Sequence, residues 1–433
     1  METSEKRAEN ETDAGFDGKG SALARELSNT FRSLKYRNYR LYFVGQLLSL
    51  SGTWMQQVAL SWLVYRLTHS AFLLGLVEGA TLFPVMLFGL FGGWVADRSE
   101  KRTVLIVCQL GAMMQALILA LLTYNNQIQV WQCVALALFL GTVNAFEIPC
   151  RQSFLPELID RKDLVNAISL NSSIFNGARV IGPAIAGIAI PIFGEAACFS
   201  LNAASYLSTL IAYTLITARR ERHLEQIEKK GIGEAIAFIR NSQTIIRLLF
   251  LGGVISLCGM NYNVLMPVFA SDVFHGDVRT LAMLRGGAGL GAFLAALTLA
   301  SRGKGDFLKV NLGFAAILFG LSLMAFSSLK EYWLCQSVIV LVGFFLTAQL
   351  SGGHSLMQLA VEDELRGRVL SVYLIVMMGF SPLGSLIIGW SAAHYGAPAV
   401  VSVCAIICML AGAIYIFWAR KESGVISQGG KVF

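Results

Sequence analysis

Charged residues are scarce in this chain. Aspartate, glutamate, lysine and arginine make up 14% of its 433 residues, against roughly 25% in soluble domains. Because 55% of the residues are hydrophobic, a soluble fold of this composition could not cover its surface with polar groups. The composition therefore argues against a water-soluble protein and indicates one that is embedded in lipid.

The motifs of several kinds of catalysis are also missing. No G-x-x-x-x-G-K-[ST] sequence occurs, so an ATP-driven pump would need a separate subunit. The eight cysteines form no C-x-x-C or paired Cys/His spacing, which predicts neither a metal site nor a disulfide framework. The polar first forty residues contain no cleavable signal. We expect a protein that is not an enzyme, holds no cofactor, and takes its energy from an ion gradient or from its solute.

Long apolar runs are abundant. Residues 103–124 contain no charge, and at about 1.5 Å per residue they can cross a hydrocarbon core of ~30 Å. Twelve such runs predict an all-α membrane protein with twelve transmembrane helices in two six-helix bundles. The runs cover residues 41–65, 71–96, 103–124, 130–150, 165–192, 195–218, 248–274, 281–301, 310–329, 332–360, 369–394 and 397–419.

Lysine and arginine are distributed unevenly over the connections between these runs. Twenty-nine lie in the two tails and in alternate connections, whereas three, namely Arg66, Arg279 and Lys330, lie on the other side. This bias predicts that both termini are cytoplasmic, and we expect a bacterial inner membrane. It also accounts for the net charge of +7 without a nucleic-acid partner.

Composition also predicts the division of the chain into domains. Between the bundles, isoleucine and phenylalanine cluster toward one helical face, which predicts a short interfacial helix; a plain solvated linker is the alternative. The expected parts are a disordered cytoplasmic tail at 1–38, the N-terminal bundle at 39–218, the linker at 219–246, the C-terminal bundle at 247–419 and a cytoplasmic tail at 420–433.

Two glycine series indicate that the halves are copies of one design. Both read G-x4-G-x4-G-x6-G, at an offset of 202 residues. Repeated halves with a site between them are typical of a two-bundle transporter. Because only the first series contains a charge, Arg179, we expect coupling in the N-terminal half. The glycines are Gly177, Gly182, Gly187 and Gly194 in the first copy, and Gly379, Gly384, Gly389 and Gly396 in the second.

Charges within the predicted spans are functional candidates, because each costs roughly a few kcal/mol in lipid unless it is paired or hydrated. We expect Glu78 or Glu147 to exchange protons, with Arg179 setting the pKa of the carboxyl group. A static Glu–Arg pair that stabilises the bundle is the alternative. Arg285 is a further cation within a span, without an evident partner.

Uncharged polar residues in the first and seventh spans are candidates for the lining of a solute cavity. Amides can bind the carbonyls or hydroxyls of a solute, and an aromatic ring can contact its apolar part. Hydrogen bonding between helices is the alternative. The candidates are Gln56, Gln57, Asn261, Tyr262 and Asn263.

The second predicted connection, residues 93–105, reads GWVADRSEKRTVL. It resembles the G-x-L-A-D-R-x-G-R-K-x-x-L motif of the major facilitator superfamily, with Val95 and Glu100 as departures. The resemblance implies the major facilitator fold and a gate on the cytoplasmic side, where a carboxylate can bind cations or the positive end of a helix. In the second half Ser301 takes the place of the aspartate, which predicts an asymmetric gate. The implied gate residues are Gly93, Asp97, Arg98, Lys101 and Arg102.

The fifth predicted span resembles the G-P-x-x-G-G signature of antiporters in the same superfamily, with Ala186 in place of one glycine. The matching positions are Gly177, Gly182, Pro183 and Gly187. Close helix packing without any bearing on direction is the alternative. The segments 52–57, 145–158, 261–263 and 366–371 resemble the branch that contains enterobactin exporters and macrolide-efflux proteins.

These resemblances imply a secondary transporter that exports a siderophore or an amphipathic drug-like molecule by proton antiport and alternating access. A proton-coupled importer is the rival within transport, and a receptor or scaffold is the rival from another class. The expected partners are the small-molecule solute, protons, the lipid bilayer and an outer-membrane efflux channel, and the protein is expected to be a monomer.

Overall fold

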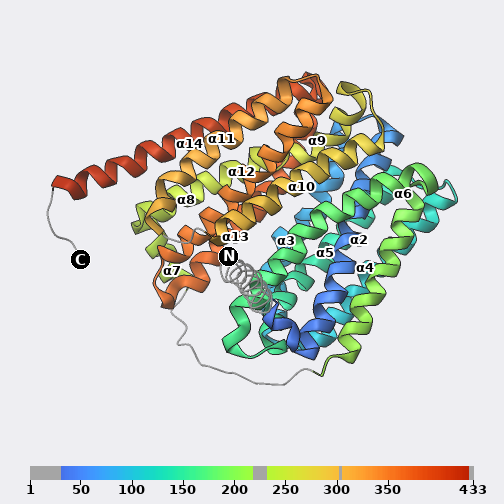
Figure 1. Ribbon diagram of the computed structural model, residues 1–433, viewed down its shortest axis with the longest axis horizontal. Coiled ribbons are helices and arrows are strands. Elements are labelled where there is room, and N and C mark those ends of the chain that lie inside the picture. Colours follow the sequence, from blue (N-terminus) through green and yellow to red (C-terminus); the bar gives the residue numbers. More distant parts are fainter. Residues whose placement is uncertain (1–30, 218–231, 302–304, 429–433) are drawn as a thin grey trace, which may run out of the picture.

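The described residues of the computed structural model, 31–217, 232–301 and 305–428, are almost entirely helical and contain no β-strand (Figure 1). The predictions for the tail at 1–30, for the first part of the linker at 218–231 and for the last residues, 429–433, lie outside these ranges. The N-terminal half contains η1 (Arg32–Lys35), α2 (Arg37–Thr68), α3 (Ala71–Arg98), α4 (Lys101–Tyr124), α5 (Val130–Phe154), η2 (Leu155–Leu158), η3 (Arg161–Asp163) and α6 (Leu164–Leu215).

The second half begins with α7, which occupies the part of the linker where the sequence predicts an interfacial helix. Two π-helical turns, η4 and η5, flank α9. The elements are α7 (Ile232–Asn241), α8 (Gln243–Val254), η4 (Ile255–Gly259), α9 (Tyr262–Val268), η5 (Phe269–Val273), α10 (Val278–Ser301), α11 (Gly305–Ser328), α12 (Tyr332–Leu359), α13 (Asp363–Tyr395) and α14 (Ala397–Gln428).

Ten helical segments of the described chain are long and apolar enough to cross a membrane, which confirms the predicted all-α membrane class. One of them, Arg161–Leu215, is interrupted at Gly194, where φ is 78° and ψ is 173°. The 32-residue helix α2 is not among the ten. It is long enough but less apolar, because it contains polar side chains such as Gln46 and Gln56.

Figure 1 shows the helices in two groups with a seam between them. In the first group α2 packs along α6, α3 along α5, and α4 against both α5 and α6. In the second, α11 packs along α12 and α14, and α10 along α12. The most extensive contacts across the seam are between α3 and α13 and between α6 and α10.

The two glycine series make equivalent contacts in the two halves. An added Cβ would lie 2.5 Å from Trp54 at Gly182 and 2.1 Å from the Leu257 carbonyl at Gly384, each within its own half. At Gly187 it would lie 2.8 Å from Ala282, and at Gly389 2.8 Å from the Ala71 carbonyl, each across the seam. The small residues therefore allow close helix packing at matching positions of the repeat.

The halves are in contact at one side of the molecule and diverge at the other. We call the side with η1, α7 and the 93–105 segment the motif side, and the side with the turn at His69 the turn side. Toward the turn side, a Cβ on Gly75 of α3 would lie 2.3 Å from the Ser385 carbonyl of α13. Toward the motif side the same face of α3 reaches Leu90, which is 66% exposed, and Gly93, where a Cβ would meet no atom within 4 Å.

The first described residues, 31–36, form a strap over the start of α6. Arg32 Nε lies 2.6 Å from Oδ1 of Asp163, Lys35 Nζ lies 2.7 Å from Oδ2, and the Asp163 side chain is 1% exposed. The Tyr36 hydroxyl donates to the same Oδ2 at 2.7 Å. Hydrogen bonds from Lys35 and Tyr36 hold the pKa of Asp163 below its usual value. In the sequence-based division of the chain, residues 31–36 belong to the N-terminal tail, and this anchor is not predicted.

We expect Asp163→Asn to lower the melting temperature more than Asp160→Asn, which alters a neighbouring exposed carboxylate. Because the pKa of Asp163 is lower in the folded state, its stabilisation is present above the ordinary carboxyl pKa and disappears as pH falls through the lowered value. The difference between wild type and Asp163→Asn should therefore shrink in strongly acidic buffer. Equal melting temperatures of the two variants at pH 7 would contradict the anchor.

Candidate functional site

A small cavity lies on the seam between the two halves. Gln57 of α2, Glu78 of α3 and Asn144 of α5 line it from the first half, and Val264 of α9 and Arg285 of α10 line it from the second. Its volume is about 70 Å³, which has room for a few water molecules and not for a drug-sized solute. In this conformation the cavity is therefore suited to water and protons.

Glu78 and Arg285 bring opposite charges to this cavity from opposite halves. They attract each other, although no ion pair within 4 Å joins them among the described residues. Arg285 donates one long hydrogen bond, 3.4 Å, to the Asn263 carbonyl, and its Nε is buried without a partner. A charge at membrane depth that faces a hydrated cavity marks an ion or solute pathway.

The two adjacent glutamines of α2 differ in their surroundings. Gln56, which is 3% exposed, donates to Gln115 Oε1 at 3.0 Å and accepts from Asn202 Nδ2 at 2.8 Å. Gln57 also lines the cavity, but among the described residues its amide forms no hydrogen bond. Gln56 therefore fits the alternative of hydrogen bonding between helices. The Gln57 amide is available to bind a group in the cavity.

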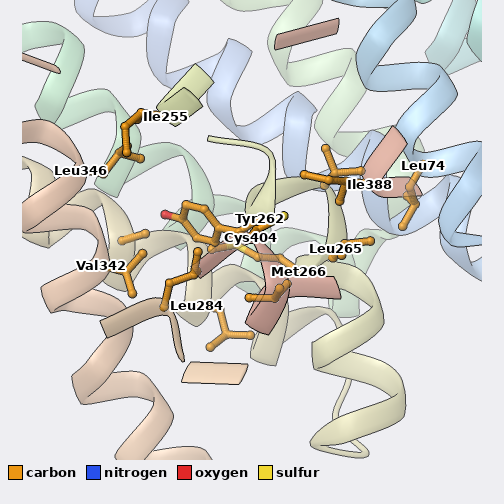
Figure 2. Close-up of a cluster of buried hydrophobic side chains, with 14 of the residues drawn as sticks. Leu74, Ile255, Tyr262, Leu265, Met266, Leu284, Val342, Leu346, Ile388 and Cys404 are labelled. Atoms are coloured by element: carbon orange, nitrogen blue, oxygen red, sulfur yellow. The ribbon is translucent and has the colours of Figure 1, made fainter. Parts of the chain in front are cut away.

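Asn261, Tyr262 and Asn263 do not line this cavity. The Asn261 amide donates to the carbonyls of Ser256 and Leu257, which the π-helical turn η4 presents. Tyr262 is 1% exposed, and Figure 2 shows its ring within an apolar cluster to which both halves contribute. The Asn263 amide donates to the carbonyl of Met260, three residues earlier in the chain, at 3.2 Å. These three polar groups are satisfied or buried inside the second half.

Glu147 belongs to a separate network inside the first half. Its Oε1 lies 3.4 Å from Arg151 Nε, one turn further along α5. Arg151 donates to Gln46 Oε1 at 3.3 Å, and the Gln46 amide donates to the Tyr213 hydroxyl at 2.9 Å. The network joins α2, α5 and α6. For Glu147, this arrangement fits the alternative of a static Glu–Arg pair that stabilises the bundle.

Arg179 is close to neither carboxylate. Its guanidinium carbon lies 5.3 Å from the centre of the Trp54 ring, at a distance typical of a cation–π contact. Trp54 in turn meets Phe175 edge to face at 5.7 Å. Within the described residues the Arg179 side chain forms neither an ion pair nor a hydrogen bond. The basic partner of Glu78 is Arg285 instead.

The residues of the 93–105 segment lie on the motif side in different surroundings. Lys101 pairs with Glu157, Arg102 donates to the Thr214 carbonyl at 2.8 Å, and Arg98 lies over the Trp94 ring at 4.4 Å. Asp97 is exposed, and the described chain provides it with neither an ion pair nor a hydrogen bond. The basic residues are therefore engaged within the first half, while the aspartate is unpaired in this conformation.

In the antiporter-like segment, the glycines serve helix contacts. Gly182 meets α2 and Gly187 meets α10, and a Cβ on Gly177 would meet no atom within 4 Å. Pro183 lies inside α6, next to Gly182. The geometry fits the close-packing alternative, since Gly187 is one of the contacts across the seam.

The sequence did not indicate one of the cavity residues or one of the contacts across the seam. Asn144 lines the cavity, and a lone amide within an apolar run was the available signal. On the turn side, the Tyr65 hydroxyl donates to Asp272 Oδ2 at 2.5 Å and joins α2 to η5 across the seam. Nothing in the spacing of these two residues indicates that they meet.

Comparison with known proteins gives the family. The family model described as "Transmembrane secretion effector", of the major facilitator superfamily, matches residues 28–425. The staphyloferrin A transporter of Staphylococcus aureus is 28% identical over 391 residues, covering 88% of this chain and 96% of that protein. The macrolide efflux protein A of Streptococcus pyogenes is 22% identical, covering 82% and 90%. The multidrug efflux pump Tap of Mycolicibacterium fortuitum is 22% identical, covering 88% and 95%.

Among solved structures, a bacterial homologue of the human lysosomal transporter Spinster, inward-facing and occupied, matches with a TM-score of 0.71 at 15% identity. The match covers 89% of this chain and 97% of that one, and at this identity it supports the fold alone. The resemblance predicted from residues 93–105 is confirmed, as is the expectation that the protein is not an enzyme. The chain belongs to the transmembrane secretion effector family of the major facilitator superfamily, and its relatives are membrane transporters.

Proposed function

We propose that this protein is a proton-coupled exporter of an organic solute, located in a bacterial inner membrane with both termini in the cytoplasm. The observation that carries the proposal is that Glu78 and Arg285 line one water-sized cavity from opposite halves. Protonation of Glu78 would weaken its attraction to Arg285, so a proton could change the relation between the halves. Secondary transporters typically place coupling-ion sites near the interface of their repeats, which is where this pair lies.

The asymmetry of the seam supports alternating access. The proposed architecture has twelve spans in two six-helix bundles, in which α2 and both parts of α6 are counted as spans. The turn side is held by the Tyr65–Asp272 hydrogen bond and by close packing at Gly75, while the motif side is open. In the opposite state the motif side would close, and we propose that Asp97 then meets a cation or the start of a helix of the second half.

The direction of transport is proposed from relatives and from sequence. The Streptococcus and Mycolicibacterium relatives are named as efflux proteins, and the segment around Gly182 and Pro183 resembles the antiporter signature. The proposed solute is a siderophore or an amphipathic drug-like molecule. Uptake by proton symport remains the rival, because the fold serves both directions. Monomeric action and delivery to an outer-membrane channel are parts of the same proposal.

Transport into inverted membrane vesicles with an acid interior tests this function. Labelled siderophores and hydrophobic antibiotics should accumulate inside, and a protonophore should abolish the accumulation. Vesicles without the protein are the control. Accumulation that is unchanged by the protonophore would exclude proton antiport, and gradient-driven accumulation in right-side-out vesicles only would identify an importer.

A further inference from the structure

One cation at membrane depth has no counter-ion. Among the described residues, Glu78 lies near Arg285 and Glu147 pairs with Arg151, whereas Arg179 forms neither an ion pair nor a hydrogen bond. An unpaired guanidinium in such a place is costly unless water or a ligand solvates it.

The surroundings of Arg179 are aromatic. Its guanidinium lies over Trp54, and Phe175, one turn earlier on α6, meets the same indole ring edge to face. Phe175 is 42% exposed, so it offers an apolar surface beside the charge. Because the stacked guanidinium keeps its five N–H donors, it can still bind a carboxylate through two parallel hydrogen bonds.

The position of Arg179 along the seam gives a solute access to it. A Cβ on Gly289 of α10 would lie 2.6 Å from the Arg179 carbonyl, so the halves touch at this level. One turn earlier on the same face of α6, Phe175 is 42% exposed. Arg179 thus lies beside a contact between the halves, next to a partly exposed ring on its own helix face. The cavity at Glu78, with about 70 Å³, is too small for an organic solute.

We propose that Arg179, Trp54 and Phe175 form a binding site for an amphipathic organic anion, in which Arg179 binds a carboxylate and the two rings bind an adjacent aromatic or apolar group. The site rests on the proposed transport function for its role, and it names the class of solute that enters from the motif side. Glu78, with Arg285 beside it, remains the proposed proton site. Solute and proton therefore bind at separate places on the same seam.

Equilibrium binding of three small probes to the purified full-length protein in nanodiscs tests the site without any gradient. The probes share one ring system and differ in charge: 1-naphthoate, 1-naphthamide and 1-naphthylmethylamine. We expect 1-naphthoate to bind about tenfold or more tightly than the other two, since a charge-assisted bidentate contact is worth this much. Arg179→Gln should remove that preference and leave 1-naphthamide binding within about twofold.

Two further variants keep the test decisive. Arg279→Gln, which removes an exposed arginine on the turn side, should bind all three probes as the wild type does. Arg179→Lys keeps the charge without the planar fork and should retain part of the preference for 1-naphthoate. Equal binding of 1-naphthoate and 1-naphthamide to the wild type, or an unchanged preference in Arg179→Gln, would overturn the site. Arg179-dependent binding without proton-driven export in vesicles would overturn the transport proposal and leave the site standing.

Discussion

Replacing Gly75 by alanine should open the turn side and reduce transport about tenfold or more. The added Cβ would lie 2.3 Å from the Ser385 carbonyl and 3.1 Å from the Gly389 Cα. Both are backbone atoms of α13, so no side-chain rotation can relieve the overlap. Overpacking of this kind costs about 1–3 kcal/mol, and each 1.4 kcal/mol shifts a two-state population about tenfold. The conformation closed on the turn side would therefore become rare.

The expected loss of transport is opposite in direction to the effect of the substitution on the stability of α3 as a helix. Alanine favours a helix over glycine by about 1 kcal/mol, so a loss of function could not be explained by a weaker α3. Gly253→Ala in α8 is the matched control, because its Cβ would meet nothing closer than 3.4 Å. Spin labels at the exposed turn residues His69 and His275 should move apart in Gly75→Ala and stay unchanged in Gly253→Ala. An unchanged distance in both variants would disprove that Gly75 limits the closed state.

Glu78→Gln should abolish proton-driven accumulation, with a loss of about tenfold or more, while exchange of labelled for unlabelled solute continues. Glutamine has nearly the same shape but cannot take up a proton in this pH range. Exchange requires only that the loaded protein changes conformation, so it should survive. The variant leaves Arg285 without its opposite charge, and a second variant, Glu78→Gln with Arg285→Gln, separates this cost from the loss of the proton site.

The matched control is Glu195→Gln, which alters a buried carboxylate. This carboxylate pairs with Arg66 at 2.8 Å, away from the cavity. It should keep most of the gradient-driven accumulation. Glu147→Gln decides between the two carboxylates that the sequence singled out. Full coupling in Glu78→Gln, together with a loss in Glu147→Gln, would transfer the proton site to Glu147 and refute the assignment made from the cavity.

The fold class and the motif were predictable from sequence because they depend on local patterns. Apolar runs of sufficient length give the helices, and residues 93–105 give the superfamily. α2 shows the limit: it is long enough to span but less apolar than its neighbours, because it buries amides that bond to other helices. Judged by hydropathy alone, such a helix is a weaker candidate for a membrane span.

The site was predictable only as a set of candidates. Glu78 and Arg285 were both visible as charges within spans, but their meeting depends on how α3 and α10 approach the seam. Gln56 and Gln57 are neighbours in sequence and both border the cavity, yet only the Gln56 amide is held by Gln115 and Asn202. Consecutive residues point about 100° apart on a helix, so only the packing of the helices decides which of two adjacent amides is available.

The glycines that close the two series have a mechanical consequence. Gly194 and Gly396, with φ of 78° and 82°, each reverse the chain within a single residue, a conformation that residues with a side chain rarely adopt. There is no loop at these points to absorb a displacement. Any change of angle between the helix before the turn and the helix after it must therefore be taken up by the φ and ψ angles of that single glycine, both between α13 and α14 and between the two parts of α6.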